Sequence, residues 1–412
     1  MNFAYTYGSW WQDDFALRRF VQHLLTSEAQ LLCRDVLAAR PPAPWPDNFA
    51  LDERGLGIDS LDRLHLVASL GEALDVQFVR RDAAQLAHAE FGAWCAASAA
   101  ALARNRSATL CFRSSGSTGQ PERHRHALAE LVEEAEFLAT LWPGRRRVLC
   151  AVPAHHIYGF IFSVLLPQAL GGLVVEEVAN PAALVARWQP GDLLIGFPDF
   201  WRALARFGRQ APADICATSS TAPCPSEVAI AIAAMGMGLT EIFGSTETAG
   251  LGWRADPDAA FCRFPWWRVN ADGHWLRRLP DGERIADLPD YLETVGDAHF
   301  RPAGRCDAKV QVGGMNVSLA AVRAQLLAHP WVQDAAVRLM RPEEGARLKA
   351  FIVPRPGAPA EAPLRAELTT WIAAQLPPAQ RPRALRFGSQ LPRGTMGKAA
   401  EWDSAIRDEH AG

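Results

Sequence analysis

The hydrophobic pattern near the N-terminus predicts two helices separated by a proline-rich break. Residues 13–40 have apolar positions at helical spacing, and residues 60–75 form a second amphipathic stretch. The segment Pro41–Pro46 lies between them and interrupts any helix. The positions that define the two helices are Phe15, Leu17, Phe20, Val21, Leu24 and Leu25, followed by Leu61, Leu64, Val67 and Leu70.

From about residue 107 the pattern changes to short apolar runs that alternate with helical stretches. The clearest runs are residues 147–152, 173–178 and 192–196. This alternation predicts an α/β architecture with a largely parallel sheet. Residues 255–303 are rich in proline, aspartate, glycine and tryptophan, and they predict strands joined by turns.

A small α+β unit is predicted after Gly304. It reads as a strand (308–312), a helix (318–328), two strands (335–340 and 348–354) and a helix (364–376), with a proline-rich loop at 354–363. We therefore expect an α/β protein: a large N-terminal domain with mixed β-sheets and flanking helices, and a small α+β C-terminal domain. Its parts are 1–106, a shortened N-terminal region; 107–304, the core; and 305–412, the C-terminal domain.

Composition excludes several classes of protein. The 412 residues are 49% hydrophobic and 21% charged, as in an ordinary globular protein of two or three domains. A net charge of -3 does not favour nucleic-acid binding. The eight cysteines form no C-x-x-C pair, which argues against zinc fingers and redox motifs and favours reduced thiols in a cytoplasm. We expect no signal peptide and no membrane span.

Ser114–Pro121 is the most informative motif. Its glycines permit tight backbone turns, and its hydroxyl and amide groups suit a phosphate anion. A short buried strand is predicted before it, at Thr109–Phe112. The Gly-Lys-Ser/Thr offset of a P-loop is missing, and a polar linker has a similar composition.

A second motif, Glu241–Thr248, places Glu247 among hydroxyl side chains. One carboxylate beside phosphate oxygens is a typical environment for Mg²⁺. The alternative is a polar loop whose serine or threonine caps a helix.

Further motifs follow in order, and together they indicate a family. They are Pro153–Gly159, Thr294–Asp297, Gly304–Asp307, Gly313–Val317 and Leu391–Lys398. Over residues 107–400 the chain resembles the superfamily of adenylate-forming enzymes, which comprises acyl- and aryl-CoA synthetases, peptide-synthetase adenylation domains and luciferases.

The resemblance implies that ATP and Mg²⁺ bind along these motifs. Ser117 and Thr118 would donate to the β- and γ-phosphates, and Glu247 would hold the metal. Asp297 would bind the ribose. The full set implied for nucleotide binding is Ser114, Ser115, Gly116, Ser117, Thr118, Gly119, Arg123, Thr221, Ala222, Pro223, Phe243, Gly244, Asp297 and Arg305.

The catalytic residues that the resemblance implies are Lys398, His156 and Thr246. Lys398 would reach the α-phosphate and the carboxylate oxygen, and Thr246 would touch the α-phosphate. His156 would lie where the acid meets the thiol; the alternative is an ordinary core histidine. Asp307 matches the hinge on which the C-terminal domain moves. The implied substrate pocket consists of His156, Tyr158, Gly159, Ser245, Gly250 and Trp253.

The chain departs from the family pattern in three ways. Glu122 stands where a lysine is usual, so Arg123 is a candidate replacement, and Gln311 replaces another lysine. The region before residue 107 is short. His124 and His126 are expected to belong to a solvated basic stretch.

Gly55–Leu61 resembles the attachment motif of acyl carrier proteins, with Ser60 at the phosphopantetheine position. The same letters begin an ordinary helix with Asp59 or Ser60 as N-cap. We favour the cap, or a decayed carrier-like segment, over a working carrier.

The expected function is ATP-dependent activation of a carboxylic acid, followed by transfer to a thiol. The chain resembles compact ligases of aryl polyene and xanthomonadin-type pigment pathways. This resemblance implies an aryl acid such as 3-hydroxybenzoate as the substrate and the phosphopantetheine of a separate acyl carrier protein as the acceptor. The aromatic cluster Trp253, Phe264, Trp266 and Trp267 suits an aryl pocket or a packed core equally. The alternatives are a CoA-dependent synthetase and a degenerate fold that only binds nucleotide.

Overall fold

The computed structural model describes residues 7–32, 44–105, 108–114, 122–305, 309–341, 344–345 and 347–391. The chain forms two compact units. One comprises residues 1–113, 123–287 and 294–301, and the other comprises residues 114–122, 288–293 and 302–412. Each is described by itself below.

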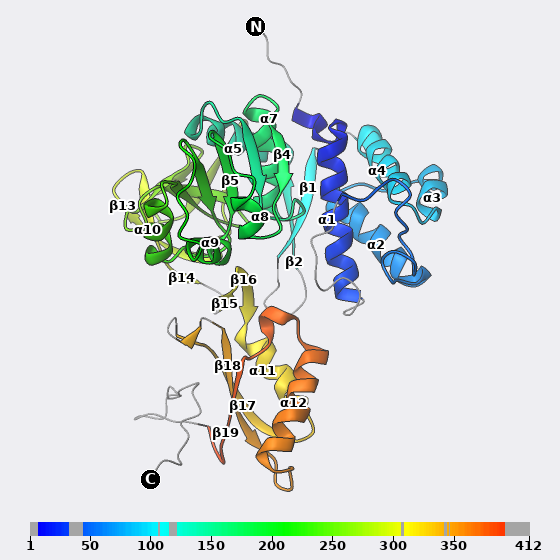
Figure 1. Ribbon diagram of the computed structural model, residues 1–412, viewed down its shortest axis with the longest axis vertical. Helices are drawn as coiled ribbons and strands as arrows, with labels where there is room; N and C mark the ends of the chain where they lie inside the picture. The colour runs from blue at the N-terminus through cyan, green and yellow to red at the C-terminus, as the bar shows by residue number, and fades with distance from the viewer. Residues whose placement is uncertain are drawn as a thin grey trace. The chain divides into compact units, whose positions relative to one another are not determined.

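The N-terminal helices lie together in the first unit (Figure 1). A 3-10 helix, η1 (Tyr7–Gln12), precedes α1 (Asp14–Leu32), and α2 (Ser60–Ala73), α3 (Arg80–Ala87) and α4 (Phe91–Asn105) follow. Helix α1 packs against α2 and α4. Its buried face includes Leu17, Phe20 and Leu24, as the apolar spacing predicted, whereas Phe15 of the same pattern is exposed.

Helix α2 begins at the carrier-like motif, and its start is a capping box. The Asp59 carboxylate accepts hydrogen bonds from the amides of Leu61 (2.8 Å) and Asp62 (2.9 Å). Asp62 in return accepts from the amide of Asp59. Helix capping therefore explains the sequence Asp59-Ser60-Leu61, with Asp59 as the N-cap and Ser60 as the first helical residue.

This capping predicts that Ser60 carries no phosphopantetheine. Incubation with CoA and a broad-specificity phosphopantetheinyl transferase should leave the intact mass unchanged, while an authentic carrier protein in the same tube should gain the prosthetic group. Mass gain that disappears in Ser60→Ala would contradict the cap interpretation.

The large sheet of the chain follows. A two-stranded pair, β1 (Thr109–Ser114) and β2 (Glu122–Ala127), precedes it. The sheet has nine strands in the order β13-β14-β9-β8-β7-β6-β5-β3-β4. Its strands are β3 (Arg147–Cys150), β4 (Val174–Glu177), β5 (Asp192–Gly196), β6 (Cys216–Ser219), β7 (Gly238–Ser245), β8 (Ala249–Arg254), β9 (Phe261–Arg263), β13 (Asp290–Val295) and β14 (His299–Arg305).

Strands β4, β3, β5, β6 and β7 run parallel, and β8 and β9 turn antiparallel. A core cluster that contains Leu149, Leu194 and Trp201 joins the parallel strands to α8 (Pro181–Val185), α9 (Pro198–Ala205) and α10 (Ser226–Ala234). The alternate strand residues Val148 and Leu193 are also buried, so protein covers both sheet faces.

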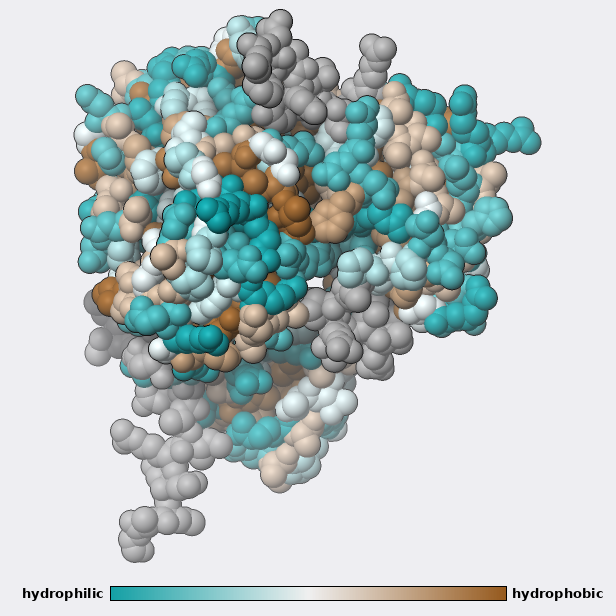
Figure 2. Space-filling view, turned by 45° about the horizontal axis from the view of Figure 1, so that its top comes forward, coloured by the Kyte–Doolittle hydropathy of each residue, from teal (hydrophilic) through white to brown (hydrophobic). Residues whose placement is uncertain are grey.

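The remaining elements of this part of the chain flank the sheet. They are α5 (Leu128–Leu141), α6 (Ile157–Phe160), the π-helical turn η2 (Ile161–Leu165), α7 (Leu166–Ala169) and the three-stranded sheet β10 (Trp267–Val269), β11 (Trp275–Leu279) and β12 (Gly282–Ile285). Over the described residues, no helix has the length and apolarity needed to cross a bilayer. The face seen in Figure 2 carries mainly hydrophilic residues, with small apolar patches among them.

The second unit contains the predicted C-terminal elements. Its hairpin is β15 (Lys309–Val312) with β16 (Met315–Ser318), followed by α11 (Leu319–Leu327), β17 (Val332–Leu339), β18 (Leu348–Pro354), α12 (Glu361–Gln375), the 3-10 turn η4 (Pro378–Gln380) and β19 (Ala384–Phe387). The sheet order is β17-β18-β19. Both helices contribute to its core, through Leu326 and Leu368. The α/β fold class with a small α+β C-terminal part is confirmed.

Candidate active site

The carboxyl ends of neighbouring parallel strands bring the predicted loops to one edge of the sheet. The His155–His156 turn follows β3, Thr221–Pro223 follows β6, and Phe243–Glu247 lies at the end of β7. Strands β3, β5, β6 and β7 are adjacent and parallel. Loops at the carboxyl edge of such a sheet are the usual location of a ligand site.

The turn that carries Thr246 and Glu247 is a tight β7–β8 hairpin with a bulge at Phe243/Gly244. Ala249 has a positive φ of 59°. A Cβ at Gly244 would lie 2.3 Å from the Ala249 carbonyl oxygen, so only glycine fits there. A residue other than glycine at positive φ costs conformational energy, and such strain is common at functional sites.

Strand β2 supports this turn through His126. The His126 ring is buried, and its Nε2–H donates to the Thr246 carbonyl at 2.7 Å. Burial lowers the pKa of His126, and the hydrogen bond to Thr246 opposes that effect in part. The expectation that His126 lies in a solvated stretch is wrong, because the period-two alternation of a strand turns its ring inward.

Glu247, on the same turn, has one carboxylate oxygen that could bind a metal ion. Its side chain is 14% exposed, and the His124 Nε2 is 3.9 Å from its Oε1. Its Oε2 is buried and has no hydrogen-bond partner among the described residues. A buried carboxylate oxygen without a partner is rare in proteins, and it suits a hard cation such as Mg²⁺. The residues present therefore fit the predicted metal.

Glu134 of α5 contacts the β8 side of the hairpin, a role that sequence reasoning did not predict. Its Oε2 accepts the Gly250 amide at 2.9 Å, and the Trp267 indole donates to the Gly250 carbonyl at 2.8 Å. Burial raises the pKa of Glu134 to about 7, although the Gly250 amide and Arg277 act in the opposite direction. The only hint in the sequence was a glutamate at a position with core spacing in a helix.

This raised pKa predicts a pH-dependent stability. Between the ordinary value of 4.5 and about 7, the folded protein keeps a proton that the unfolded chain has released. Stability therefore falls as pH rises through that window, by roughly 3 kcal/mol at most. Glu134→Gln should remove most of this loss, measured by urea unfolding at pH 4.5 and pH 8. Glu136→Gln, at an exposed position of the same helix, should retain it; equal pH dependence in Glu134→Gln and wild type would contradict the assignment.

The segment after β6 is held in an unusual conformation. Thr221 has a positive φ of 77°, which is rare for a β-branched residue. Ser220 Oγ donates to the Ile242 carbonyl at 2.9 Å, and the Cys224 amide donates to Glu241 at 2.9 Å. These bonds tie both sides of Thr221–Pro223 to β7. The backbone is thus fixed where the sequence predicted contact with adenine.

The turn after β3 places His155 and His156 side by side, with ring centroids 4.1 Å apart. Desolvation by the surrounding protein lowers the pKa of His156 to about 4, although the residue is exposed at the surface. Burial likewise lowers the pKa of His155 well below its usual range. Both imidazoles are therefore neutral at pH 7.

Tyr158 and Gly159 belong to the short helix α6 beside this turn. The Tyr158 hydroxyl bonds to Thr218 Oγ1 at 2.7 Å and donates to the Gly196 carbonyl at 3.1 Å, and burial raises its pKa. A Cβ at Gly159 would lie 2.0 Å from the Pro153 carbonyl oxygen. These contacts link the histidine turn to β5 and β6.

The aromatic cluster is divided by the structure. Phe264, Trp266 and Trp267 are buried and pack in the core, with Arg277 over both tryptophan rings at 4.7 and 5.6 Å. Core packing explains these three. Trp253 is half-buried on β8, and its indole N–H has no partner among the described residues.

Arg123 is already engaged in an ion pair. Its guanidinium contacts Glu72 of α2, and Arg113 contacts the same carboxylate at 2.8 Å. Glu28 of α1 also accepts from Arg113, at 3.0 Å. The residues that precede and follow the Ser114–Pro121 motif are thus both attached to α2. Because Glu72 already pairs with the Arg123 guanidinium, this ion pair would have to break before Arg123 could replace the missing lysine at a phosphate.

The remaining predicted residues lie in or after the β13–β14 turn, or outside the described residues. Asp297 is exposed in the β13–β14 turn, where its carbonyl accepts from Arg263 at 2.6 Å. Arg305 ends β14 and Gln311 lies in β15, and the structure describes no side chain for Arg305. Outside the described residues lie Ser115, Gly116, Ser117, Thr118, Gly119, Asp307 and Lys398.

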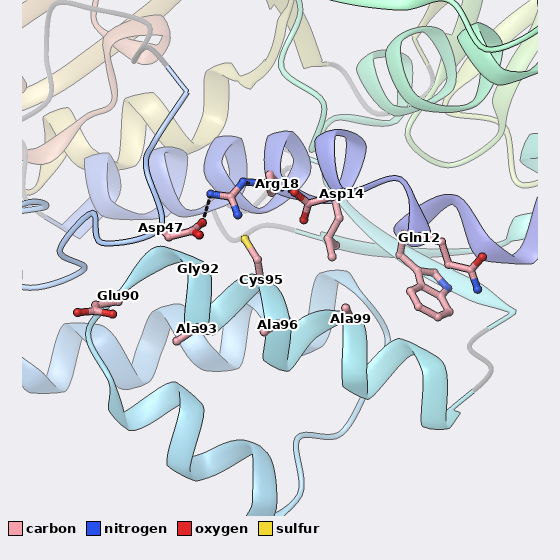
Figure 3. Close-up of a pocket in the computed structure, with 12 residues that line it drawn as sticks. Gln12, Asp14, Arg18, Asp47, Glu90, Gly92, Ala93, Cys95, Ala96 and Ala99 are labelled. Carbon is pink, nitrogen blue, oxygen red and sulfur yellow. Dashed lines mark ion pairs between the residues drawn. The ribbon is translucent and has the colours of Figure 1, made fainter.

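A pocket of about 590 Å³ lies elsewhere, between η1, α1 and α4 (Figure 3). Asp14, Arg18, Asp47 and Glu90 line it together with Cys95, and Arg18 pairs with Asp47 at 2.7 Å. None of the predicted site residues lines this pocket.

Sequence comparisons cover almost the whole chain. The chain matches the AMP-binding enzyme family over residues 52–269 and the AMP-binding enzyme C-terminal domain over residues 322–398. It is 36% identical to a 4-coumarate–CoA ligase of Halorhodospira halophila, over 90% of this chain and 91% of that protein. It is also 36% identical to a 4-coumarate–CoA ligase of Rhodobacter capsulatus, over 94% of this chain and 100% of the relative.

Solved structures show the same fold at lower identity. The o-succinylbenzoate CoA synthetase of Bacillus subtilis matches with a TM-score of 0.57 at 18% identity, over 70% of this chain and 67% of that one. A malonyl-CoA ligase matches with a TM-score of 0.55 at 23% identity, over 69% of this chain and 71% of that one. The family match starts at residue 52 and so includes helix α2, which carries the carrier-like motif. The chain therefore belongs to the AMP-binding enzyme family and is an ATP-dependent acid–thiol ligase.

Proposed function

We propose that this ligase joins a 4-hydroxycinnamate, such as 4-coumarate, to the thiol of CoA. The observation that carries the proposal is the end-to-end similarity to 4-coumarate–CoA ligases, at 36% identity over 94% of this chain and 100% of the Rhodobacter capsulatus protein. The supporting geometry is the set of loops at the carboxyl ends of β3, β6 and β7.

The reaction has two steps. A carboxylate oxygen attacks the α-phosphorus of ATP, a P–O bond forms, and pyrophosphate leaves. The thiol of CoA then attacks the carbonyl carbon of the acyl-adenylate, loses its proton, and displaces AMP to give the thioester. Because phosphoryl transfer needs little covalent participation by the protein, positioning and charge stabilisation dominate catalysis.

Each residue receives a role in this proposal. Glu247 holds Mg²⁺, which would offset negative charge on the phosphate oxygens. Thr246 contacts the α-phosphate, Asp297 binds the ribose, and Lys398 stabilises charge at the α-phosphate and the carboxylate. Thr221–Pro223 borders adenine. The unpaired oxygen of Glu247 and the fixed turn around Thr246 support the first two roles.

His156 faces the reacting acid in this proposal. Its neutral imidazole at pH 7 avoids a fixed positive charge that would hold the substrate carboxylate or the adenylate intermediate too tightly. Ser245, Gly250 and Trp253 border the ring of the acid. The indole N–H of Trp253, buried and without a described partner, is available to an oxygen of the substrate.

CoA replaces the carrier protein as the proposed acceptor. The curated relatives named above are CoA ligases. The same relatives favour a hydroxycinnamate over 3-hydroxybenzoate as the acid. The carrier protein as acceptor and 3-hydroxybenzoate as acid are both included as alternatives in the test.

The test measures pyrophosphate release and thioester formation by the purified full-length chain with ATP and Mg²⁺. The acids are 4-coumarate, cinnamate, 3-hydroxybenzoate and a medium-chain fatty acid, each with CoA and with a phosphopantetheinylated carrier protein. We expect the highest kcat/KM for 4-coumarate with CoA. A higher value for 3-hydroxybenzoate, or transfer to the carrier protein alone, would overturn the proposal. ATP binding without pyrophosphate release for any acid would indicate a nucleotide-binding module.

A further inference from the structure

Helix α1 places two charged or polar side chains against the base of the histidine turn. Arg19 and His23 are one turn apart on α1, and their side chains are only 7% and 13% exposed. Arg19 donates to Glu177 at 2.8 Å and to Ser163 Oγ at 2.9 Å, and His23 Nε2 lies 3.0 Å from the same Glu177 oxygen. Glu177 ends β4, the strand next to β3.

The other nitrogen of His23 contacts the backbone of the turn. The Ala154 amide donates to His23 Nδ1 at 2.9 Å. An amide N–H can only donate, so Nδ1 must carry a lone pair and the proton must be on Nε2. Nε2–H then donates to Glu177, which fixes the tautomer and the orientation of the ring.

Glu177 remains ionised to maintain this arrangement. Burial alone would raise its pKa, but the hydrogen bonds from His23 and Arg19 and the charge of Arg19 outweigh burial and lower the pKa. In this series of hydrogen bonds, the Glu177 carboxylate orients the His23 imidazole, and the imidazole accepts the backbone amide of Ala154.

The amide that His23 holds directly precedes the two histidines of the site. Two backbone hydrogen bonds also close the turn. The His156 amide donates to the Pro153 carbonyl at 3.3 Å, and the Phe160 amide donates to the His156 carbonyl at 2.7 Å. A hydrogen bond from Ser163 Oγ to the Gly159 carbonyl, at 2.6 Å, connects Arg19 to the far end of the turn. Of these contacts, the bond to His23 joins a side chain of α1 directly to the backbone of the turn, whereas Arg19 reaches the turn through Ser163.

We propose that His23 is a positioning residue of the acid site. It accepts the Ala154 amide and so fixes the backbone that presents His156 to the reacting carboxyl group, without contacting substrate itself. The inference rests on the proposed function, because it takes His156 as part of the acid site. The sequence shows His23 only as one polar residue on an amphipathic helix.

Two substitutions separate the two hydrogen bonds of His23. In His23→Asn, the amide oxygen occupies the Nδ1 position and can accept from Ala154, while the contact with Glu177 is lost. In His23→Gln, the longer side chain reaches Glu177 as a donor and presents carbon where Nδ1 was. Arg18→Gln is the control on the same helix, because Arg18 pairs with Asp47 in the pocket of Figure 3.

The first readout is steady-state kinetics. His23→Gln should lower kcat/KM for the acid by roughly 10- to 100-fold, because a small displacement of a reacting geometry has such effects. Its KM for ATP should stay within about twofold of wild type, since the contacts of His23, to Ala154 and Glu177, involve none of the residues predicted to bind ATP. His23→Asn should restore most of the activity, and Arg18→Gln should equal wild type. Equal activity of His23→Gln and His23→Asn would overturn the proposal.

The second readout does not depend on activity. Amide hydrogen exchange over residues 151–160 should accelerate in His23→Gln, because the Ala154 amide loses its acceptor, and should stay slow in His23→Asn. Unchanged protection in both variants would refute the contact. If the two variants exchange as expected but the wild-type protein forms no thioester, the proposed function is refuted and the hydrogen bond from Ala154 to His23 is established.

Discussion

Replacement of Lys398 by alanine is expected to reduce acid-dependent ATP–pyrophosphate exchange by about 10²- to 10³-fold, the loss typical when one group that stabilises transition-state charge is removed. Negative charge builds on the α-phosphate and on the departing pyrophosphate during adenylation, and an ammonium group offsets it. Lys398 follows Gly397 at the end of the Leu391–Lys398 motif, within the matched C-terminal domain, although it lies outside the described residues.

Two controls distinguish loss of this charge from loss of the fold. Lys398→Arg retains a cation and should keep more activity than Lys398→Ala. Thermal unfolding of both variants should match wild type. Full exchange activity in Lys398→Ala would remove this residue from the mechanism.

The second large effect is expected for Gly244→Ala. A methyl group at this position would lie 2.3 Å from the Ala249 carbonyl oxygen across the hairpin, and backbone atoms cannot move aside easily. The hairpin must open, which displaces Thr246 and Glu247 and should lower adenylation roughly 100-fold. Overpacking of this kind should also lower the free energy of unfolding by about 1–3 kcal/mol.

Gly238→Ala is the matched control, because Gly238 begins the same strand and a Cβ there meets nothing within 4 Å. It should leave adenylation and stability near wild type. Comparable losses in the two alanine variants would contradict the close approach at the hairpin as the cause of the effect.

The carrier-like motif at Gly55–Leu61 shows that one short sequence segment can match two different structures. Asp59 and Ser60 satisfy the attachment pattern, but they also satisfy a capping box, which needs only the three residues that follow. Local hydrogen bonds decide such a case, and here they favour the helix start. The family match across residues 52–269 is consistent with α2 as part of the ligase.

Other features depended on contacts between distant residues. Glu134 and Gly250 are 116 positions apart, and His126 and Thr246 are 120 positions apart. Neither pair has a sequence signal, because hydrogen bonds across a fold leave no periodic pattern in one chain. Arg123 was a candidate phosphate ligand by its position, yet Glu72 of α2 competes for it.

The sequence by itself determined the α/β class, the main elements of the C-terminal part and the family, because hydrophobic period and ordered loop motifs are local properties. It also predicted that the motifs after β3, β6 and β7 act together. Only the tertiary structure decided which aromatic residues are core, that His126 and Glu134 hold the Thr246–Glu247 hairpin, and that His23 holds the histidine turn. The physical reason is that burial and hydrogen-bond partners are set by how distant segments pack, and the parallel order of the strands brings those segments to one edge.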